Sequence, residues 1–220
     1  MLTRIYHIIK RDVRVEMRER FSFLSSILYL VAITFVVYKI FGTLEGATKV
    51  GLFWVLLVFT AINTVGTSFS QISQKRKLNH YQLYDATELM IGKLLVNFFK
   101  LFIAGLILLG LQCLFSNELL KQPQMFFQGF FLASIGLVAI MTLVSGIAVY
   151  SQNQNGLVAI LSLPLLIPIL LLGMNVSIIS ESPESMSLGD TVNNYLYMLL
   201  GIDIVLVVLT IIFIPIIWKS

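Results

Sequence analysis

Charged residues are scarce in this sequence. Asp, Glu, Lys and Arg together make up only 12% of its 220 residues, whereas about a quarter of the residues in a soluble globular domain are charged. So few charges exclude an ordinary soluble domain. The hydrophobic share of 58% instead indicates a protein that uses lipid as its solvent.

Residues that carry chemistry are also rare. The single cysteine, Cys113, lies in an apolar run and excludes an intrachain disulfide. Neither His7 nor His80 has a Cys, Asp or Glu at a recognisable metal-ligand interval. The sequence also has no glycine-rich phosphate loop, no His-Glu-x-x-His and no Gly-x-Ser-x-Gly. It therefore predicts no catalytic residue, no metal site and no cofactor bound by this chain.

Long apolar runs dominate what is present. Each run is long enough to cross a bilayer, which requires about 20 residues. Lipid cannot satisfy backbone hydrogen bonds and the runs do not alternate as barrel strands do, so helices are expected. The first run is longer than a signal peptide's apolar core and has no cleavage site. The sequence predicts one all-α polytopic membrane domain over residues 1–220, with spans at about 23–41, 51–70, 94–115, 126–150, 157–179 and 195–217.

The positive charges predict the orientation. Lys and Arg gather before the first run, between the second and third runs, and at Lys219. The opposite connections carry only Lys49 and Lys121, with Lys39 at a span end. Because cytoplasmic loops are enriched in Lys and Arg, both termini should be cytoplasmic. The net charge of +4 then suits anionic lipid rather than nucleic acid.

Residues 1–20 form an element of their own. Apolar side chains recur every three or four positions, and charged residues fill the other face. We expect an amphipathic helix on the inner leaflet. The alternative is a charged flank that only orients the first span. The apolar stripe consists of Leu2, Ile5, Ile9, Val13, Met17 and Phe21.

Residues 71–93, between the second and third runs, are longer than a simple connection requires. Aromatic and acidic side chains at helical spacing follow three consecutive basic residues, so a cytoplasmic coupling helix is expected here. Such a helix could bind a soluble ATPase. The alternative is a positively charged loop with some helical content. The residues proposed for the interface are Lys75, Arg76, Lys77, Tyr81, Tyr84, Glu88 and Leu89.

Two charges lie inside spans. Lys100 is about six residues into the third run, and its long side chain can reach back to the headgroups. Asp203 is about eight residues into the sixth run, where its short side chain cannot escape. Asp203 is therefore the better candidate for a functional charge, although a protonated acid or a structural bond to Asn175 or Tyr197 is an equal alternative. Because the two residues enter from opposite leaflets, no pairing is expected.

The fifth run contains Pro164 and Pro168, four residues apart. Each proline removes a backbone donor and clashes with the preceding turn, so the helix should kink or break near mid-membrane. A kink of this kind could serve as a hinge for movement. The alternative is a static kink.

Several stretches resemble a known family. "LMIGKLLVNFF" at the third span, "TLVSGIAVYSQNQNGLVAILSLPLLIPILLLG" through the fourth and fifth, and the final "IPIIWKS" are similar to the heme exporter protein B family, CcmB. The resemblance covers nearly the whole chain. In the coupling segment the sequence lacks the family's glycine, and Asp85-Ala86 stands where Ser-Pro is usual.

The resemblance implies a permease of the type-2 ABC exporter kind in the bacterial inner membrane. It would work as a pair of copies with a separate ATP-hydrolysing subunit (CcmA) and beside a heme-handling subunit (CcmC). ATP would be bound by the former and heme by the latter. The role in cytochrome c maturation would be heme export or the ATP-driven release of a heme chaperone (CcmE).

Two other functions are compatible with the residues. One is a type-2 permease for another cargo, such as a lipid-linked glycan or a drug. The other is a membrane scaffold or assembly factor that never meets an ATPase.

Overall fold

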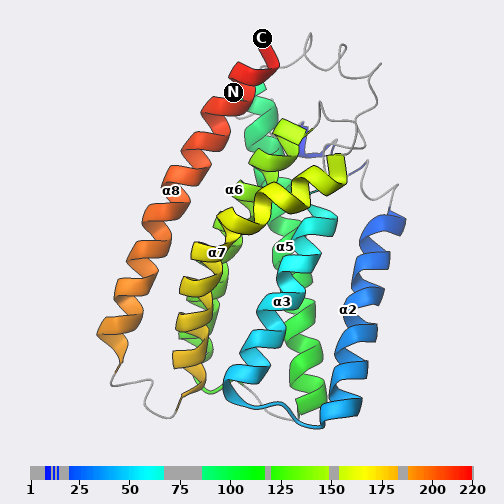
Figure 1. Ribbon diagram of the computed structural model, residues 1–220, viewed down its shortest axis with the longest axis vertical. Helices are drawn as coiled ribbons and strands as arrows, with labels where there is room; N and C mark the ends of the chain where they lie inside the picture. Colours follow the sequence, from blue (N-terminus) through cyan, green and yellow to red (C-terminus); the bar gives the residue numbers. More distant parts are fainter. Residues whose placement is uncertain are drawn as a thin grey trace.

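The computed structural model describes residues 8–10, 12, 14, 20–66, 86–116, 120–148, 154–182 and 188–219. Within these residues the chain forms long helices and no strand, and six helices are long and apolar enough to cross a membrane. The predicted all-α fold with six membrane-spanning helices is therefore confirmed. In the labels of Figure 1 they are α2 (Arg20–Phe41), α3 (Gly46–Thr64), α5 (Ala86–Ser116), α6 (Pro123–Ala148), α7 (Gln154–Glu181) and α8 (Gly189–Lys219).

The six helices alternate in direction along the long axis. Helices α2, α5 and α7 end at the lower end of Figure 1, where α3, α6 and α8 begin. We call this the outer end and the opposite end the inner end. At the outer end α2 stops at Gly42, whose φ of 73° lies in the left-handed region. Because glycine adopts this conformation without a Cβ clash, it can close a helix and turn the chain towards α3.

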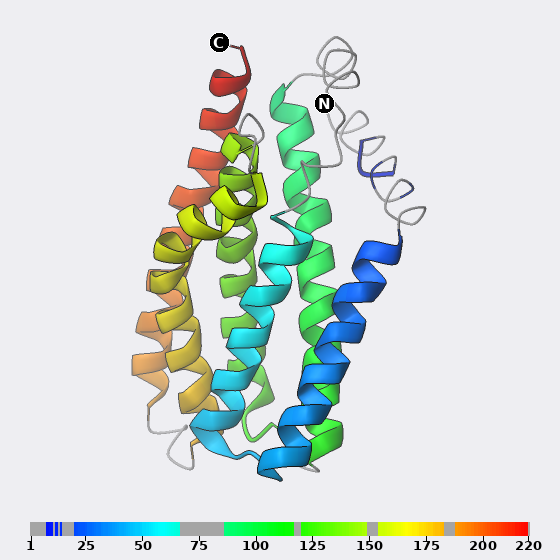
Figure 2. The same ribbon diagram turned by 45° about the vertical axis from the view of Figure 1, so that its right-hand side comes forward.

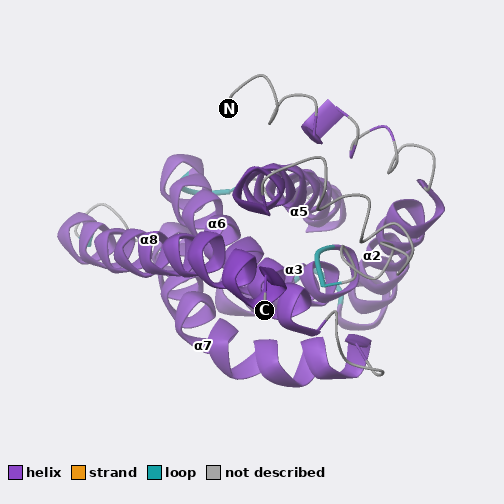
Figure 3. Cartoon of the chain, turned by 90° about the horizontal axis from the view of Figure 1, so that it is seen from above, coloured by secondary structure: helices purple, strands orange, loops and turns teal. Residues whose placement is uncertain are grey.

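Helix α6 is the centre of the bundle. Figure 3, which looks along the bundle, shows α2 and α8 on opposite sides and α6 between α5, α7 and α8. The share of the span that is buried is 72% for α6 but only 17% for α2 and for α8. Small residues on α6 allow this close packing, because they let neighbouring helices approach its backbone.

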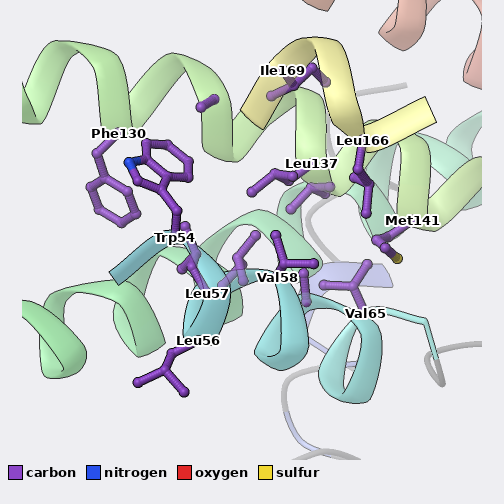
Figure 4. Close-up of a cluster of buried hydrophobic side chains, with 14 of the residues drawn as sticks. Trp54, Leu56, Leu57, Val58, Val65, Phe130, Leu137, Met141, Leu166 and Ile169 are labelled. Carbon is purple, nitrogen blue, oxygen red and sulfur yellow. The ribbon is translucent and has the colours of Figure 1, made fainter. Parts of the chain in front are cut away.

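An aromatic cluster joins α3, α5 and α6. Figure 4 shows Trp54 of α3 beside Phe130 of α6. The Phe130 ring also stacks on Phe102 of α5, with 4.9 Å between centroids, and meets Phe53 edge-on at 5.5 Å. Aromatic pairs at these distances add about 0.5–1.5 kcal/mol each beyond the burial of their area.

Gly105 of α5 fits directly against this cluster. A Cβ atom at Gly105 would lie 2.6 Å from Cε2 of Phe130 and 3.2 Å from Cδ1 of Leu57. Real carbon atoms do not approach so closely, so the α5–α6 contact requires glycine here. The aromatic cluster thereby fixes the distance between three of the spans.

Candidate functional site

The predicted coupling segment is only partly described. Lys75, Arg76, Lys77, Tyr81 and Tyr84 lie outside the described residues, so their role stays a prediction.

The described remainder of that segment, residues 86–93, belongs to α5. This helix has 31 residues and is therefore roughly 46 Å long at the usual rise, longer than the hydrocarbon core of a bilayer. Its first turns can therefore project beyond the lipid. Within this chain Glu88 and Leu89 are buried, with 6% and 8% of their surfaces exposed. Their part in the predicted interface stays a prediction.

The described N-terminal residues pack on the start of α5. Ile8 is fully buried, and a Cβ atom at Gly92 would lie 2.8 Å from its Cγ2. One residue further along α5, the ammonium nitrogen of Lys93 lies 3.5 Å from Oδ2 of Asp12. The predicted interfacial helix is helical at residues 8–10, 12 and 14, and the rest of it lies outside the described residues. The contact joins the two segments that were expected at the cytoplasmic surface.

Helix α7 is bent without being interrupted. It is continuous from Gln154 to Glu181, with Pro164 and Pro168 inside it. Figures 1 and 2 show that it changes direction in its yellow part, which contains both prolines. Because proline has no N–H, the carbonyl groups of Ile160 and Pro164 lose their partners four residues along the helix. This loss explains the bend, and whether the bend is a hinge stays a prediction.

The outer half of α7 is tied to its neighbours. The indole nitrogen of Trp54 donates a hydrogen bond to the hydroxyl oxygen of Ser177 at 3.1 Å, and both groups are buried. A Cβ atom at Gly173 would lie 2.6 Å from the Trp54 ring, and one at Gly129 of α6 would lie 2.7 Å from Val176. The outer half of α7 is therefore held by one interhelical hydrogen bond and two close backbone approaches.

The inner half of α7 has looser contacts. Ile160 is 73% exposed, and Leu163 and Ile167 are also exposed. Val158 is buried, 3.0 Å from the position of a Cβ at Gly66. The hydroxyl of Ser162 bonds back to its own helix, at the carbonyl of Ala159. The two halves of α7 thus differ in how firmly they are held, and the prolines lie between them.

Asp203 of α8 is buried where α6, α7 and α8 meet. Only 4% of its surface is exposed, and neither carboxylate oxygen accepts a hydrogen bond from any described residue. A Cβ atom at Gly136 of α6 would overlap Oδ1 of Asp203 and would lie 2.5 Å from Cδ1 of Ile169 of α7. The acid is therefore in contact with backbone and aliphatic groups.

The alternative bond from Asp203 to Asn175 or Tyr197 is wrong. Both of those side chains are exposed on the outside of their helices, so they point away from the buried acid. Lys100 of α5 is half-buried, and it forms no ion pair with Asp203, whose carboxylate has no partner among the described residues. No Lys100–Asp203 pair was expected, and none is found among the described residues.

Two hydrogen bonds between helices were not predicted from the sequence. Asn97 of α5 bonds to Thr142 of α6 at 3.2 Å, and Thr210 of α8 bonds to the carbonyl of Ala139 at 3.2 Å. A signal for the helix packing was present, because Gly129, Ala133 and Gly136 recur at helical spacing, as small residues do at membrane helix interfaces. No three His, Cys, Asp or Glu side chains gather within the described part of the chain to hold a metal ion.

Comparison with known protein families places the chain in one of them. The family model described as CcmB protein matches residues 3–216, which is nearly the entire chain. No curated protein matches the chain.

Proposed function

The chain belongs to the CcmB family, and from this premise we propose that it transmits movement from a partner ATPase to the outer side of the membrane. Membership makes it a multi-pass membrane protein, the permease subunit of an ABC transporter that acts in cytochrome c maturation. The match over residues 3–216 carries this conclusion, and the six apolar helices agree with it. The match favours a role in cytochrome c maturation over the transport of a lipid-linked glycan or a drug by a type-2 permease.

The proposed partner is a separate ATP-hydrolysing subunit of the CcmA kind. In the proposal it docks on the coupling segment around Lys75 to Tyr84, which supplies basic and aromatic side chains at the cytoplasmic surface. This segment runs into α5 at Ala86 without a further span between them. A push on the coupling segment would therefore reach α5 and, through the Lys93–Asp12 ion pair, the N-terminal residues.

The proposed movement occurs at the bend of α7. The outer half is joined to α3 by the Trp54–Ser177 hydrogen bond. The inner half, in which Val158 and Ser162 are buried, has no side-chain hydrogen bond to another helix among the described residues. Movement of the inner spans would change the angle at Pro164 and Pro168, where backbone hydrogen bonds are already missing. The outer half would keep its packing.

In this proposal the partner subunits bind ATP and heme and carry out the chemical steps. ATP is bound and hydrolysed by the CcmA-like subunit, and heme is held by a CcmC-like subunit beside this chain, which itself binds no cofactor. A second copy of the chain completes the permease. Whether the movement exports heme or releases a heme chaperone, the task of this chain would be force transmission, because neither histidine falls within an apolar run of the sequence.

The proposed location is the bacterial inner membrane, with both termini cytoplasmic. The distribution of Lys and Arg supports this orientation, since the inner end of the bundle follows the basic residues 1–20 and carries Lys219.

Purification tests the proposal directly. The tagged chain, extracted in mild detergent from its own membrane, should bring with it an ATP-hydrolysing subunit and a second, differently tagged copy. A preparation that contains other membrane proteins but no nucleotide-hydrolysing subunit would contradict the proposal and favour a scaffold or assembly factor.

A further inference from the structure

We propose that Asp203 is a proton-binding site at the contact of α6, α7 and α8, and that the position of α7 controls whether the proton is held. The proposal goes beyond the transport role, which needs no titratable group in the bundle. The proposal rests first on the burial of Asp203, which is 4% exposed. Neither of its carboxylate oxygens has a hydrogen-bond partner among the described residues.

The immediate surroundings of Asp203 favour a neutral side chain. Gly136 brings the α6 backbone against Oδ1, and Ile169 of α7 packs on the same spot. Neither residue offers a side-chain donor. An ionised carboxylate that is buried among apolar groups and lacks a partner is strongly disfavoured, in protein and in lipid alike. Binding a proton removes the charge and with it most of this penalty.

No ionisable side chain on the packed helices neutralises the acid. Helix α6 contains none over Pro123–Ala148, and α7 contains only Glu181, in its last turn at the outer end. On α8 the ionisable residues other than Asp203 are Asp190, Tyr195 and Tyr197 towards the outer end, and Lys219 at the inner end of the helix.

Helix α5 also packs on α8 and brings Lys100 to a similar depth. Asn97 and Gly105 of α5 lie against Thr142 and Phe130 of α6, so Lys100 falls between them, close to the level of Gly136. It forms no ion pair with Asp203. The remaining ionisable side chains described on α5 lie towards its two ends, and they are Glu88, Lys93 and Cys113.

The available atoms suit a proton better than a metal cation. Calcium and magnesium require about six oxygen ligands, whereas Asp203 lies against Gly136, on which the Ile169 side chain also packs. A single carboxyl group is enough to bind a proton. The ligand that this site can hold in the described packing is therefore a proton.

Ile169 connects the site to the bend of α7. It is fully buried and follows Pro168 directly. When α7 is bent as observed, Ile169 covers Asp203 and keeps water away from it. A change of angle at the prolines would lift Ile169 from Gly136 and Asp203, admit water, and let the proton leave. Proton release would then report on the conformation of α7.

Infrared spectroscopy of the full-length chain in lipid nanodiscs at pH 7 tests the site. A protonated aspartic acid has a carbonyl band separate from that of a carboxylate, and labelling aspartate with carbon-13 shifts that band. The chain has only four aspartates, Asp12, Asp85, Asp190 and Asp203. In the wild type we expect a protonated-acid band that shifts with the label. Asp203→Asn should lose this band. Asp190→Asn, which alters an exposed acid on the same helix, should keep it.

The labelled wild-type spectrum can overturn the proposal even if Asp203→Asn does not fold. Absence of any protonated-aspartate band in the wild type would overturn the proposal, as would a band that remains in a folded Asp203→Asn. Replacing sodium by potassium in the buffer should leave the band unchanged, and a band that depends on the cation would contradict the choice of a proton.

A pair of neighbouring variants tests the role of α7. Ile169→Ala removes the cover over Asp203, whereas Ile167→Ala shortens an exposed side chain two residues away. On transfer to heavy water, the acid band should move to its deuterated position sooner in Ile169→Ala than in wild type. Ile167→Ala should match wild type. Equal rates in all three proteins would overturn the claim that α7 controls the proton, and these measurements need no ATPase.

Discussion

The indole nitrogen of Trp54 lies 3.1 Å from the hydroxyl oxygen of Ser177 and donates a hydrogen bond to it. This bond joins α3 to the outer half of α7, on the outer side of Pro164 and Pro168. The hydroxyl of Ser177 in turn donates to the carbonyl of Gly173 at 2.8 Å. The outer half of α7 is therefore fixed by polar contacts as well as by apolar packing.

Trp54→Phe should weaken the α3–α7 contact. The variant keeps an aromatic ring but loses the donor, and Ser177 keeps its own bond to Gly173, so the loss should be about 1 kcal/mol from the bond, plus a packing term. Thermal unfolding in detergent measures it. A double-mutant cycle with Ser177→Ala should show non-additive losses, and fully additive losses would mean that the hydrogen bond contributes nothing.

Gly105→Ala should destabilise the protein, whereas Gly110→Ala on the same helix should not. A Cβ at Gly105 would collide with the Phe130 ring, but a Cβ at Gly110 meets nothing within 4 Å. Overpacking of this kind typically costs about 1–3 kcal/mol, and glycine to alanine in an open helical position is neutral or favourable. The midpoints of thermal unfolding check the difference. Equal midpoints would contradict the close α5–α6 approach.

Reversing the charges of Lys75, Arg76 and Lys77 together with Tyr84→Ala should abolish co-purification of the ATPase. The variant removes the basic and aromatic side chains proposed to contact it. Lys121→Glu, an exposed charge near the start of α6 at the outer end, is the control and should leave binding unchanged. Co-purification at the wild-type level by the multiple variant would defeat the docking assignment.

Lys93→Glu should release the N-terminal residues from α5. The substitution places two carboxylates together in a partly buried contact, where the present pair is 3.5 Å apart. We expect chymotrypsin, whose cleavage sites are not changed by substitution of Lys93 or Asp12, to cleave the N-terminal segment about fivefold faster, which corresponds to roughly 1 kcal/mol. The exchange Asp12→Lys with Lys93→Glu should restore the wild-type rate, and failure of the exchange to do so would argue against the ion pair.

Much of the fold could be predicted because lipid leaves few alternatives for an apolar run. The six spans follow from length and composition alone. The segment before the third span was harder, because residues 86–93 carry polar side chains and yet continue α5 as helix. Propensity and amphipathic spacing do not show where a membrane-spanning helix begins, and part of the expected coupling segment belongs to the same helix as the third span.

The site was predicted less well, because its contacts join residues far apart in the sequence. Periodicity indicated that Asp203 is inside a span but not what it faces, and the expected partners Asn175 and Tyr197 point elsewhere. The Trp54–Ser177 bond joins residues 123 positions apart. The bend in α7 could be predicted from the sequence, because it is a local effect of the N–H groups that the two prolines lack.

Distances between spin labels show whether the inner half of α7 moves relative to its outer half. Cys113→Ser removes the single native cysteine, and labels can then be placed at exposed positions on α7 and α8. One pair, Ile160→Cys with Ile212→Cys, reports on the inner half of α7, and the other, Leu171→Cys with Met198→Cys, on the outer half. In the complex with the ATPase, binding of ATP should change the inner distance and leave the outer one unchanged. If ATP leaves the inner distance unchanged, or if both distances change equally, movement about Pro164 and Pro168 is contradicted.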